Sequence, residues 1–436
     1  MDLRLSDQFN KYLLEIYPPD QPGAAVNIIR NGKIIFRKGY GLANLELNVP
    51  IEPNMVFRIG SITKQFTAVC ILKLFEQGML TLKDDINKHL PDFNTHGHKI
   101  SIENLLTHTS GIPNYNEMAE WQKVRSMDIT PEELIALFNG KNLEFNPGDD
   151  FMYSNSGYVL LGVIIEKITG MKYSDFIREI IFNPLKMNQS YYDTSEMIIP
   201  NRVNGYSRNG HEYSNASYLN INHAYAAGSL ASTIDDLAIW DNSIYKGKIV
   251  NINLLSKAFK PFMLRNSIST NYGYGWRVYL HEGLSMYEHA GGINGFLACS
   301  LRIPEEKVFI SILSNCDNPQ EMLPDFVALN LSNILLNKPL NKIKSKINLP
   351  ANKLDDYIGT YHISDKSNRI ICRIKNQLFT QCTNRMKLEI YPFAADSFFF
   401  KLFSDIIIFK RDNNDKVIGM EFLHNLGPRK YYPKID

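Results

Sequence analysis

The chain has 436 residues, more than one ordinary domain needs, and its apolar content of 44% is sufficient for a large hydrophobic core. The net charge is only +2 and no long basic run occurs, which argues against nucleic acid as a partner. No apolar stretch reaches the length needed to cross a bilayer, so we expect no transmembrane segment.

The first predicted element is an amphipathic helix over residues 1–17, where apolar Leu5, Phe9 and Leu13 recur at helical spacing among charged residues. A signal peptide would instead have a continuous apolar core. The protein is therefore either cytoplasmic, or periplasmic or secreted with a leader that this sequence lacks. Its five cysteines are odd in number and form no C-x-x-C pair, which favours free thiols.

A hairpin and a helix are predicted next. Strand-like Ala24–Arg30 and Lys33–Arg37 flank Asn31-Gly32, a dipeptide typical of two-residue hairpin turns, and this pair should begin a sheet. Further on, Ile62–Gln77 carries apolar residues at helical spacing, and Gly78 fits the C-cap of that helix.

The start of this helix carries the motif Ser61-Ile-Thr-Lys64. Ser61 follows the turn Phe57-Arg-Ile-Gly60, so we expect it at the helix N-terminus, where unpaired N–H groups and the partial positive charge favour an oxyanion. Lys64 lies three residues on and faces the same way. Because a lone S-x-x-K is more often an N-cap followed by a surface lysine, the motif gains weight only from its context.

The middle of the chain is predicted to be mostly helical, and it carries a second motif, Tyr153-Ser-Asn155. Thr130-Pro-Glu-Glu133 is a capping box with proline at the first helical position. Ser156–Ile168 is a further helix that should end at Gly170. Tyr153 is a phenol that can relay a proton.

Strand-like segments return later in the chain, together with a third motif, His289-Ala-Gly291. They are Tyr272–Leu280, Leu297–Ile303 and Val308–Ser314, and Pro304-Glu-Glu-Lys307 forms a turn between the last two. N-terminal and C-terminal strands separated by helices indicate an α+β fold. We expect an antiparallel sheet flanked by helices, a helical subdomain, and a site between them.

The composition then shifts to Lys, Asn and Pro, which is typical of a linker. We accordingly predict a first domain over residues 1–336, a linker over 337–352 and a second domain over 353–436. Short strand-like segments at turn-rich intervals indicate that the second domain is a small β-barrel. These segments are Asp355–Tyr361, Arg369–Ile374, Gln377–Gln381, Leu388–Tyr391, Ser397–Phe403, Ile406–Lys410, Val417–Phe422 and Lys430–Tyr432.

Around its motifs the chain resembles the family of class C β-lactamases, serine D-peptidases and related esterases, within the penicillin-binding-protein superfamily. The resemblance covers roughly residues 8 to 335. The segments that carry it are Phe57-Arg-Ile-Gly-Ser-Ile-Thr-Lys64, Leu105-Leu-Thr-His-Thr-Ser-Gly-Ile112, Tyr153-Ser-Asn-Ser-Gly-Tyr158, Ala226-Ala-Gly-Ser-Leu-Ala-Ser-Thr233, Tyr272-Gly-Tyr-Gly-Trp276 and His289-Ala-Gly-Gly292. Beyond them, Leu354–Tyr361 resembles the start of the lipocalin-like domain appended to some members.

The motifs together predict acyl transfer through a covalent serine intermediate. Ser61 Oγ attacks an acyl carbon, Lys64 and Tyr153 pass its proton to the leaving group, and water cleaves the acyl-enzyme. A lysine can share this work only if burial and nearby positive charge keep it partly neutral, and a tyrosine only if nearby cations favour its anion. Either residue could therefore be the base.

Four further residues are predicted to bind the substrate. Asn155 would hydrogen-bond to the catalytic lysine and to the substrate amide. By resemblance, the N–H groups of Ser61 and Gly292 form the oxyanion hole, beside Gly291. His289 departs from the Lys-Thr-Gly that β-lactamases of this class carry, and since histidine is largely neutral near pH 7, we expect a weaker grip on a substrate carboxylate.

These observations favour a serine hydrolase acting on D-amino-acid peptides or amides or on small esters. One alternative is a β-lactamase that hydrolyses β-lactam antibiotics, which His289 disfavours. Another is a non-catalytic penicillin- or peptidoglycan-recognition module, which intact Ser61, Lys64 and Tyr153 disfavour. The expected partner is a small-molecule or peptide substrate, with cell-wall fragments among the candidates. The resemblance implies no metal and no cofactor, and the oligomeric state stays open.

Overall fold

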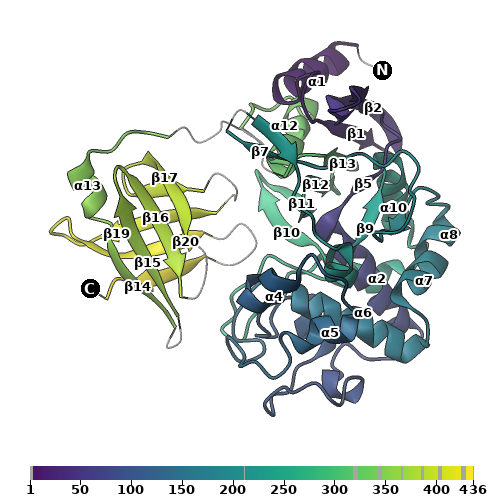
Figure 1. Cartoon of the computed structure of the whole chain (residues 1–436), viewed down its shortest axis with the longest axis horizontal. Helices are drawn as coiled ribbons and strands as arrows, with labels where there is room; N and C mark the ends of the chain where they lie inside the picture. The colour runs from purple at the N-terminus through teal and green to yellow at the C-terminus, as the bar shows by residue number, and fades with distance from the viewer. Residues whose placement is uncertain are drawn as a thin grey trace. The chain divides into compact units, whose positions relative to one another are not determined.

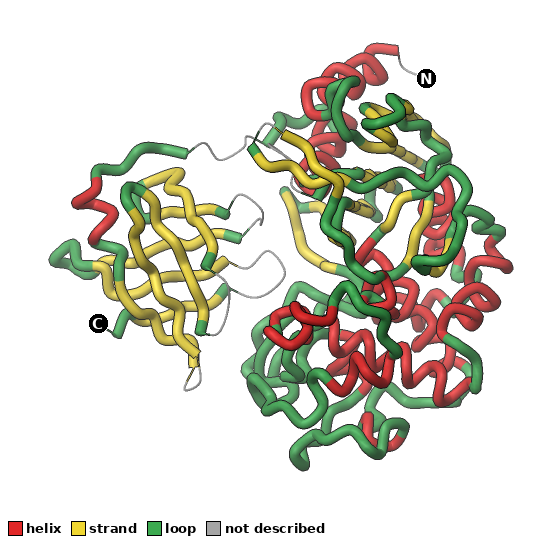
Figure 2. The backbone as a smooth tube through the Cα atoms, viewed as in Figure 1, coloured by secondary structure: helices red, strands yellow, loops and turns green. Residues whose placement is uncertain are grey.

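The computed structural model describes residues 3–210, 212–317, 323–341, 346–364, 367–383, 387–400, 405–423 and 429–435. It divides into two compact units, one of Met1–Ser267 and Asn271–Asn341, the other of Ile268–Thr270 and Lys342–Asp436. Figures 1 and 2 show the first as a mixture of helices and strands and the second as mostly strands. Residues 342–345 of the predicted linker and 401–403 of one predicted strand lie outside the described residues.

The first unit contains a sheet of six antiparallel strands in the order β10-β11-β12-β13-β1-β2. The strands are β1 Ala24–Arg30, β2 Lys33–Tyr40, β10 Arg277–His281, β11 Leu284–Ile293, β12 Phe296–Ile303 and β13 Val308–Ser314. The predicted hairpin is confirmed, since Asn31 and Gly32 have φ of 53° and 72°, as a type I′ turn requires. β1 pairs with β13, with Ala24 opposite Ser314, so the N-terminal hairpin completes the sheet.

Helices cover both faces of this sheet, which is why every residue of β13 is buried. On one face, α1 (Leu3–Ile16) and α12 (Pro324–Leu335) share a core in which Phe9 packs with Leu331. On the other face lie α2 (Thr63–Glu76) and α10 (Ile234–Lys246), where Phe66 stacks on Trp240 with ring centroids 4.2 Å apart. The predicted α+β architecture is therefore confirmed.

The helical subdomain is formed largely by the chain between β2 and β10 (Figure 1). Its helices include α3 Ile102–Leu106, α4 Ala119–Val124, α5 Pro131–Ala136, α6 Asn155–Thr169, α7 Tyr173–Ile177, α8 Asn183–Leu185, α9 Tyr225–Gly228 and α11 Ile252–Leu255. The predicted capping box of α5 is confirmed, with reciprocal bonds between Thr130 and Glu133, and α6 ends at Gly170 with φ of 69°. None of the helices among the described residues has the length and hydropathy of a membrane-spanning segment.

Short strands connect these parts of the first unit. They are β3 Leu42–Asn44, β4 Val49–Pro50, β5 Phe57–Arg58, β6 Tyr191–Tyr192, β7 Tyr206–Asn209, β8 Glu212–Asn215 and β9 Leu230–Ser232. β5 leads into the first motif and pairs with β9, which follows α9. This pairing brings the first motif next to the Ala226–Thr233 segment, although more than 160 residues separate them in the sequence.

One predicted strand begins later than expected. Residues 272–276 form a loop, and β10 starts only at Arg277. The reason is close packing of two glycines: a Cβ on Gly273 would lie 2.0 Å from the Ala258 carbonyl oxygen, and one on Gly275 would lie 2.8 Å from the Lys64 carbonyl oxygen. Gly275 also has φ of 84°, which an extended strand does not use. This loop therefore packs against the first turn of α2.

The second unit is a nearly closed barrel of eight antiparallel strands in sequence order, as predicted. The strands are β14 Gly359–Ser364, β15 Ser367–Ile374, β16 Gln377–Cys382, β17 Leu388–Ala394, β18 Ser397–Phe399, β19 Ile406–Arg411, β20 Val417–Leu423 and β21 Lys430–Pro433. A bridge between Tyr361 and Lys434, and a hydrogen bond of 2.9 Å from Ile435 N to Thr360 O, join the last segment to the first. The first predicted strand was placed too early, because Ala351–Asp355 forms the short helix α13.

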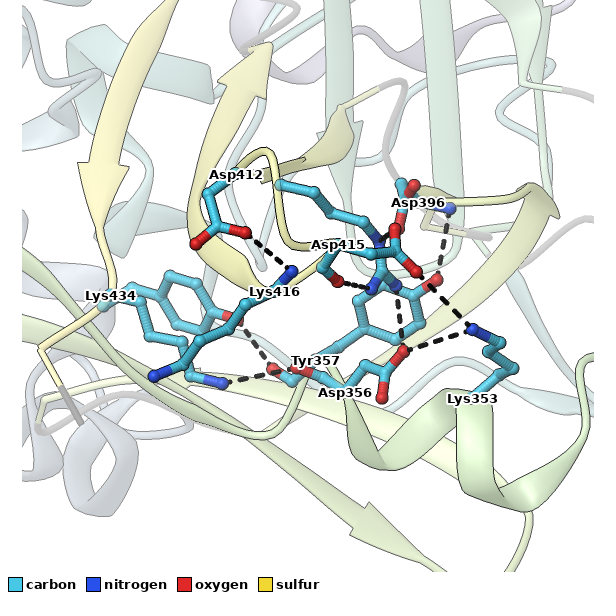
Figure 3. Close-up of polar contacts among 10 residues, drawn as sticks. Lys353, Asp356, Tyr357, Asp396, Asp412, Asp415, Lys416 and Lys434 are labelled. Atoms are coloured by element: carbon cyan, nitrogen blue, oxygen red, sulfur yellow. Dashed lines mark hydrogen bonds and ion pairs between the residues drawn. The ribbon is translucent and has the colours of Figure 1, made fainter.

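The barrel is packed with its own side chains and is braced at α13 by charged residues. Asp356 lies 3.8 Å from Lys353 (Figure 3). Arg411 donates to Asp356 at 3.1 Å and to Asp396 at 2.8 Å. Such contacts orient α13 and contribute little stability each, because solvent screens them. The stability comes from the interior, whose buried residues include Tyr357, Tyr361, Ile390, Phe398, Ile407, Phe409, Met420 and Phe422.

Candidate active site

Ser61 lies in a tight turn at the start of α2. Gly60–Ile62 forms the 3-10 turn η1, which runs directly into Thr63 as the first residue of α2. The sequence predicted Ser61 at the helix start, and the structure places it in the turn just before. Gly60 has φ of 50°, which lets the chain change direction between β5 and the helix. Ser61 lines the cleft described below.

Lys64 is fully buried and its side-chain nitrogen has three neighbours. Nζ lies 3.1 Å from Ser61 Oγ, 2.7 Å from Asn155 Oδ1 and 2.8 Å from the Ala227 carbonyl oxygen. The last two atoms can only accept hydrogen bonds. Burial holds the pKa of Lys64 well below its usual value, which favours the neutral amine. A neutral amine that spends both N–H groups on Asn155 and Ala227 turns its lone pair to the Ser61 hydroxyl.

Tyr153 lies over this lysine, with Nζ 4.8 Å from the centre of the phenol ring. Its buried hydroxyl lies near the Ser61 hydroxyl but makes no hydrogen bond of good geometry to the described residues. Burial raises the pKa of Tyr153, an effect that the nearby Ser61 hydroxyl partly offsets, so the phenol is neutral. The ring packs against His108, with the ring centroids 4.2 Å apart and the planes tilted by 36°. His108 Nδ1 accepts a hydrogen bond from the Ser154 N–H at 3.1 Å.

Strand β11 passes directly against the serine turn, and only glycines permit this approach. A Cβ on Gly291 would lie 1.9 Å from the Ile59 carbonyl oxygen and 3.2 Å from Ser61 N. A Cβ on Gly60 would lie 2.8 Å from Gly292 N. The backbone N–H groups of Ser61 and Gly292 are thereby brought to the same junction, where two such donors can stabilise an oxyanion.

His289 is buried beside this junction and both of its ring nitrogens are bound within the protein. Nδ1 lies 2.6 Å from the Ala290 carbonyl oxygen, which only accepts, so Nδ1 carries the proton. Nε2 then accepts from the Tyr272 hydroxyl at 2.8 Å. Burial lowers the pKa of His289 to about 3, so the ring is neutral at physiological pH. It does not line the cleft, unlike Ser61, Asn155 and Gly292.

The cleft at Ser61 has a volume of about 120 Å³. Besides Ser61, Asn155 and Gly292, it is lined by residues that sequence reasoning missed: Tyr115, Asn116, Trp121, Leu219, His223, Ala224, Ala227, Gly228, Ile293 and Asn294. Most of these lie in helices of one or two turns, which are too short to show a helical period in the sequence. Asn116 also positions a predicted site residue. Its Oδ1 accepts a hydrogen bond from Asn155 Nδ2 at 2.7 Å, which turns Asn155 Oδ1 toward Lys64.

A protein-family model described as Beta-lactamase matches residues 17–332. This match covers more than half of the chain and includes every residue that lines the cleft. The chain belongs to the Beta-lactamase family. The predicted resemblance is therefore confirmed, and the chain is a member of a superfamily of serine hydrolases.

Relatives in this superfamily resemble the chain over most of its length. Penicillin-binding protein 4* of Bacillus subtilis (strain 168) is 28% identical over 395 residues, which cover 86% of each protein. The octameric penicillin-binding protein homologue from Pyrococcus abyssi is 26% identical, with a TM-score of 0.69 and full coverage of both chains, so the similarity includes the barrel. A D-stereospecific amidohydrolase from Streptomyces sp. is 27% identical, with a TM-score of 0.60 over 72% of this chain and 94% of its own.

Proposed function

We propose that this protein is a serine hydrolase that forms an acyl-enzyme on Ser61 and acts on D-amino-acid peptides or amides or on small esters. The observation that carries the proposal is the buried lysine: Lys64 Nζ lies 3.1 Å from Ser61 Oγ, while its two other neighbours can only accept hydrogen bonds. A serine hydroxyl in such a position donates its proton toward the amine and becomes a nucleophile.

Acylation follows from this arrangement. Ser61 Oγ bonds to the acyl carbon while its proton moves to Lys64 Nζ. The carbonyl oxygen becomes an oxyanion held by the N–H groups of Ser61 and Gly292. The bond to the leaving group then breaks as Tyr153, neutral because its pKa is raised, donates its proton to the leaving nitrogen or oxygen. Lys64 returns the proton to the phenolate, and both residues regain their starting state.

Deacylation uses the same groups. Water enters where the leaving group stood and attacks the acyl carbon, and its proton passes to Lys64 as the base. Collapse of the second oxyanion breaks the bond to Ser61 Oγ, which takes the proton back. No group outside Ser61, Lys64 and Tyr153 is needed to balance the protons.

The preference for D-amino-acid derivatives and esters over β-lactams rests on two observations. The amidohydrolase from Streptomyces that the chain resembles is D-stereospecific by its description. His289 replaces the lysine of Lys-Thr-Gly, and its bonds to Tyr272 and Ala290 leave it no free charge for a carboxylate. Both support an amide or ester substrate.

A hydrolysis screen tests the proposal directly. Chromogenic cephalosporin, short-chain aryl esters and D-amino-acid amides are compared on the wild-type protein and on Ser61→Ala. We expect turnover of esters or D-amino-acid amides that Ser61→Ala abolishes. Turnover of the cephalosporin above both other classes would instead assign a β-lactamase, and binding without turnover of any probe would assign a recognition module.

The chain supplies its own control for the nucleophile. Ser243 begins a second S-x-x-K sequence, Ser243-Ile-Tyr-Lys246, but its hydroxyl donates to the Trp240 carbonyl at 2.6 Å and Lys246 is exposed. A fluorophosphonate should therefore add one group, on the peptide that contains Ser61. Labelling should persist in Ser243→Ala and disappear in Ser61→Ala, and an adduct on Ser243 would refute the assignment.

A further inference from the structure

The cleft beside Ser61 contains no formally charged lining residue. None of the residues that line it, within the described part of the chain, is Asp, Glu, Lys or Arg. Its polar members besides Ser61 are mainly side-chain amides, and its apolar members include Tyr115, Trp121, Leu219 and Ile293. An uncharged cleft with aromatic walls buries apolar surface well and solvates a charge poorly.

The aromatic wall is held in place by a chain of hydrogen bonds. Trp121 Nε1–H donates to His223 Nδ1 at 3.2 Å, and since Nδ1 accepts, Nε2 carries the proton and donates to the Met127 carbonyl oxygen at 3.1 Å. The Tyr115 hydroxyl donates to the His223 carbonyl oxygen. Both nitrogens of His223 are thus used in its neutral form, and Trp121 and Tyr115 present fixed ring surfaces.

Three basic side chains near Ser61, among the described residues, are already engaged. Lys64 lies within hydrogen-bond distance of Ser61, Asn155 and Ala227. His289 forms hydrogen bonds with Tyr272 and Ala290. Arg58, three residues before the serine, pairs with the buried Asp193 at 2.7 Å. A carboxylate next to the scissile bond would therefore lose its hydration without gaining a cation in exchange.

Building on the proposed function, we propose that the substrate is neutral beside the scissile carbonyl and carries an apolar group there, aromatic in size, that packs on Tyr115 and Trp121. This assigns the protein to neutral aryl- or arylalkyl-acyl esters and amides, including N-acylated amides of D-phenylalanine type. It excludes substrates with a free carboxylate next to the cleaved bond, such as a peptide with a free C-terminal D-alanine.

Two matched substrate pairs test this with the full-length protein. The first compares p-nitrophenyl phenylacetate with the mono-p-nitrophenyl ester of glutaric acid, which shares the leaving group but has a carboxylate in place of the phenyl ring. The second compares N-acetyl-D-phenylalaninamide, which is uncharged, with N-acetyl-D-phenylalanyl-D-alanine, which adds a free carboxylate. We expect kcat/KM to favour the neutral member by about tenfold or more in each pair, the range that pocket complementarity gives.

A charge-insertion variant tests whether the lack of a positive charge in the cleft causes the preference for neutral substrates. Asn294→Lys adds an ammonium group to the lining and should raise kcat/KM for the glutarate ester relative to the phenylacetate ester by about tenfold. Asn294→Gln adds bulk without charge and should keep the wild-type order of preference. Trp121→Ala should remove the preference for phenylacetate over p-nitrophenyl acetate.

The outcomes separate this inference from the proposed function. Equal or better turnover of the carboxylate-bearing members, still dependent on Ser61, would overturn the neutral-substrate assignment and leave the serine mechanism standing. Absence of Ser61-dependent turnover and of Ser61 labelling with every probe would refute the proposed function, and this inference with it. Inhibition constants for phenylboronic acid and 3-carboxyphenylboronic acid provide a second measurement. Phenylboronic acid, which lacks the carboxylate, should bind more tightly.

Discussion

Lys64 and Tyr153 have nearly equal pKa values in water, so their chemistry at this site depends on their surroundings. Burial lowers the pKa of Lys64 and raises that of Tyr153. The lysine becomes a neutral amine and the tyrosine a neutral phenol. The two residues are then complementary: the amine is prepared to take the proton of Ser61, and the phenol to give one to the leaving group.

This division of roles predicts a dependence on the leaving group. Lys64→Ala should lower acylation by about a hundredfold or more for every substrate, because the base acts on Ser61 itself. Tyr153→Phe should lower it as much for an amide but far less for a p-nitrophenyl ester, since nitrophenolate leaves without a proton. Single-turnover kinetics on both substrates measure this. Equal losses for amide and ester in Tyr153→Phe would contradict the assigned order.

His289 should make the protein less stable in acid. Its pKa is about 3 in the folded chain and about 6.5 when unfolded, so between these values the unfolded chain binds more protons. Stability is therefore lost as pH falls through this window, by about 2 kcal/mol from pH 7 to pH 5. Urea unfolding of His289→Gln should show a correspondingly smaller loss. His96→Gln, on an exposed loop, is the control and should behave like the wild type.

The residues that perform chemistry were readable from the sequence, whereas those that shape the cleft were not. Ser61, Lys64 and Asn155 stand in ordered motifs, and the structure brings all three within hydrogen-bond reach. Trp121 and His223 meet only because two short helices about a hundred residues apart in the sequence fold together. The low pKa of His289 likewise depends on its burial in the folded chain, which no spacing rule indicates.

At the scale of elements, the junction between β11 and η1 limits what the site tolerates. The Gly291→Ala change should cost activity by about a hundredfold or more, because a Cβ at 1.9 Å from the Ile59 carbonyl oxygen displaces the strand from the oxyanion junction. Gly292→Ala meets only Leu297 Cδ2 at 3.4 Å and should lose much less. Activity and thermal unfolding of the two variants, measured together, test this prediction. Similar losses of activity in both variants would show that the steric clash at Gly291 is not the cause of the loss.

The elements themselves were largely predictable where a local rule determines them. The hairpin at Asn31-Gly32, the capping box at Thr130 and the end of α6 at Gly170 depend on neighbouring residues only. The error at residues 272–276 arose because an aromatic-rich segment has strand composition, while contacts of Gly273 and Gly275 with distant backbone hold it as a loop. Tertiary packing overrode local propensity there.

At the scale of the whole molecule, each unit has a hydrophobic core of its own. A chain that ends at Asn341 should therefore fold, be labelled on Ser61 and hydrolyse small esters, because all three motifs precede that point. Its selectivity among larger substrates should change if the barrel contributes to their binding. Circular dichroism, labelling and ester kinetics against the full-length chain measure this. A chain that fails to fold would show that the units depend on each other.

The α+β class was predictable because strands at the two ends of the sequence must share one sheet. The order β13-β1-β2 was not, since β1 and β13 are nearly three hundred residues apart and nothing local selects that partner. The eight barrel strands were predictable because each pairs with its neighbour in sequence.

The glycine contacts at β11 and the side-chain wall of the cleft have different consequences for how this protein can diversify. Gly60 and Gly291 admit no other side chain without moving backbone, so the bond-breaking machinery is fixed. Tyr115, Trp121, Leu219 and Ile293 contact the substrate space without touching Lys64 through a hydrogen bond. Libraries confined to these four positions should therefore yield new selectivities at little catalytic cost, and natural relatives could have acquired theirs by the same route.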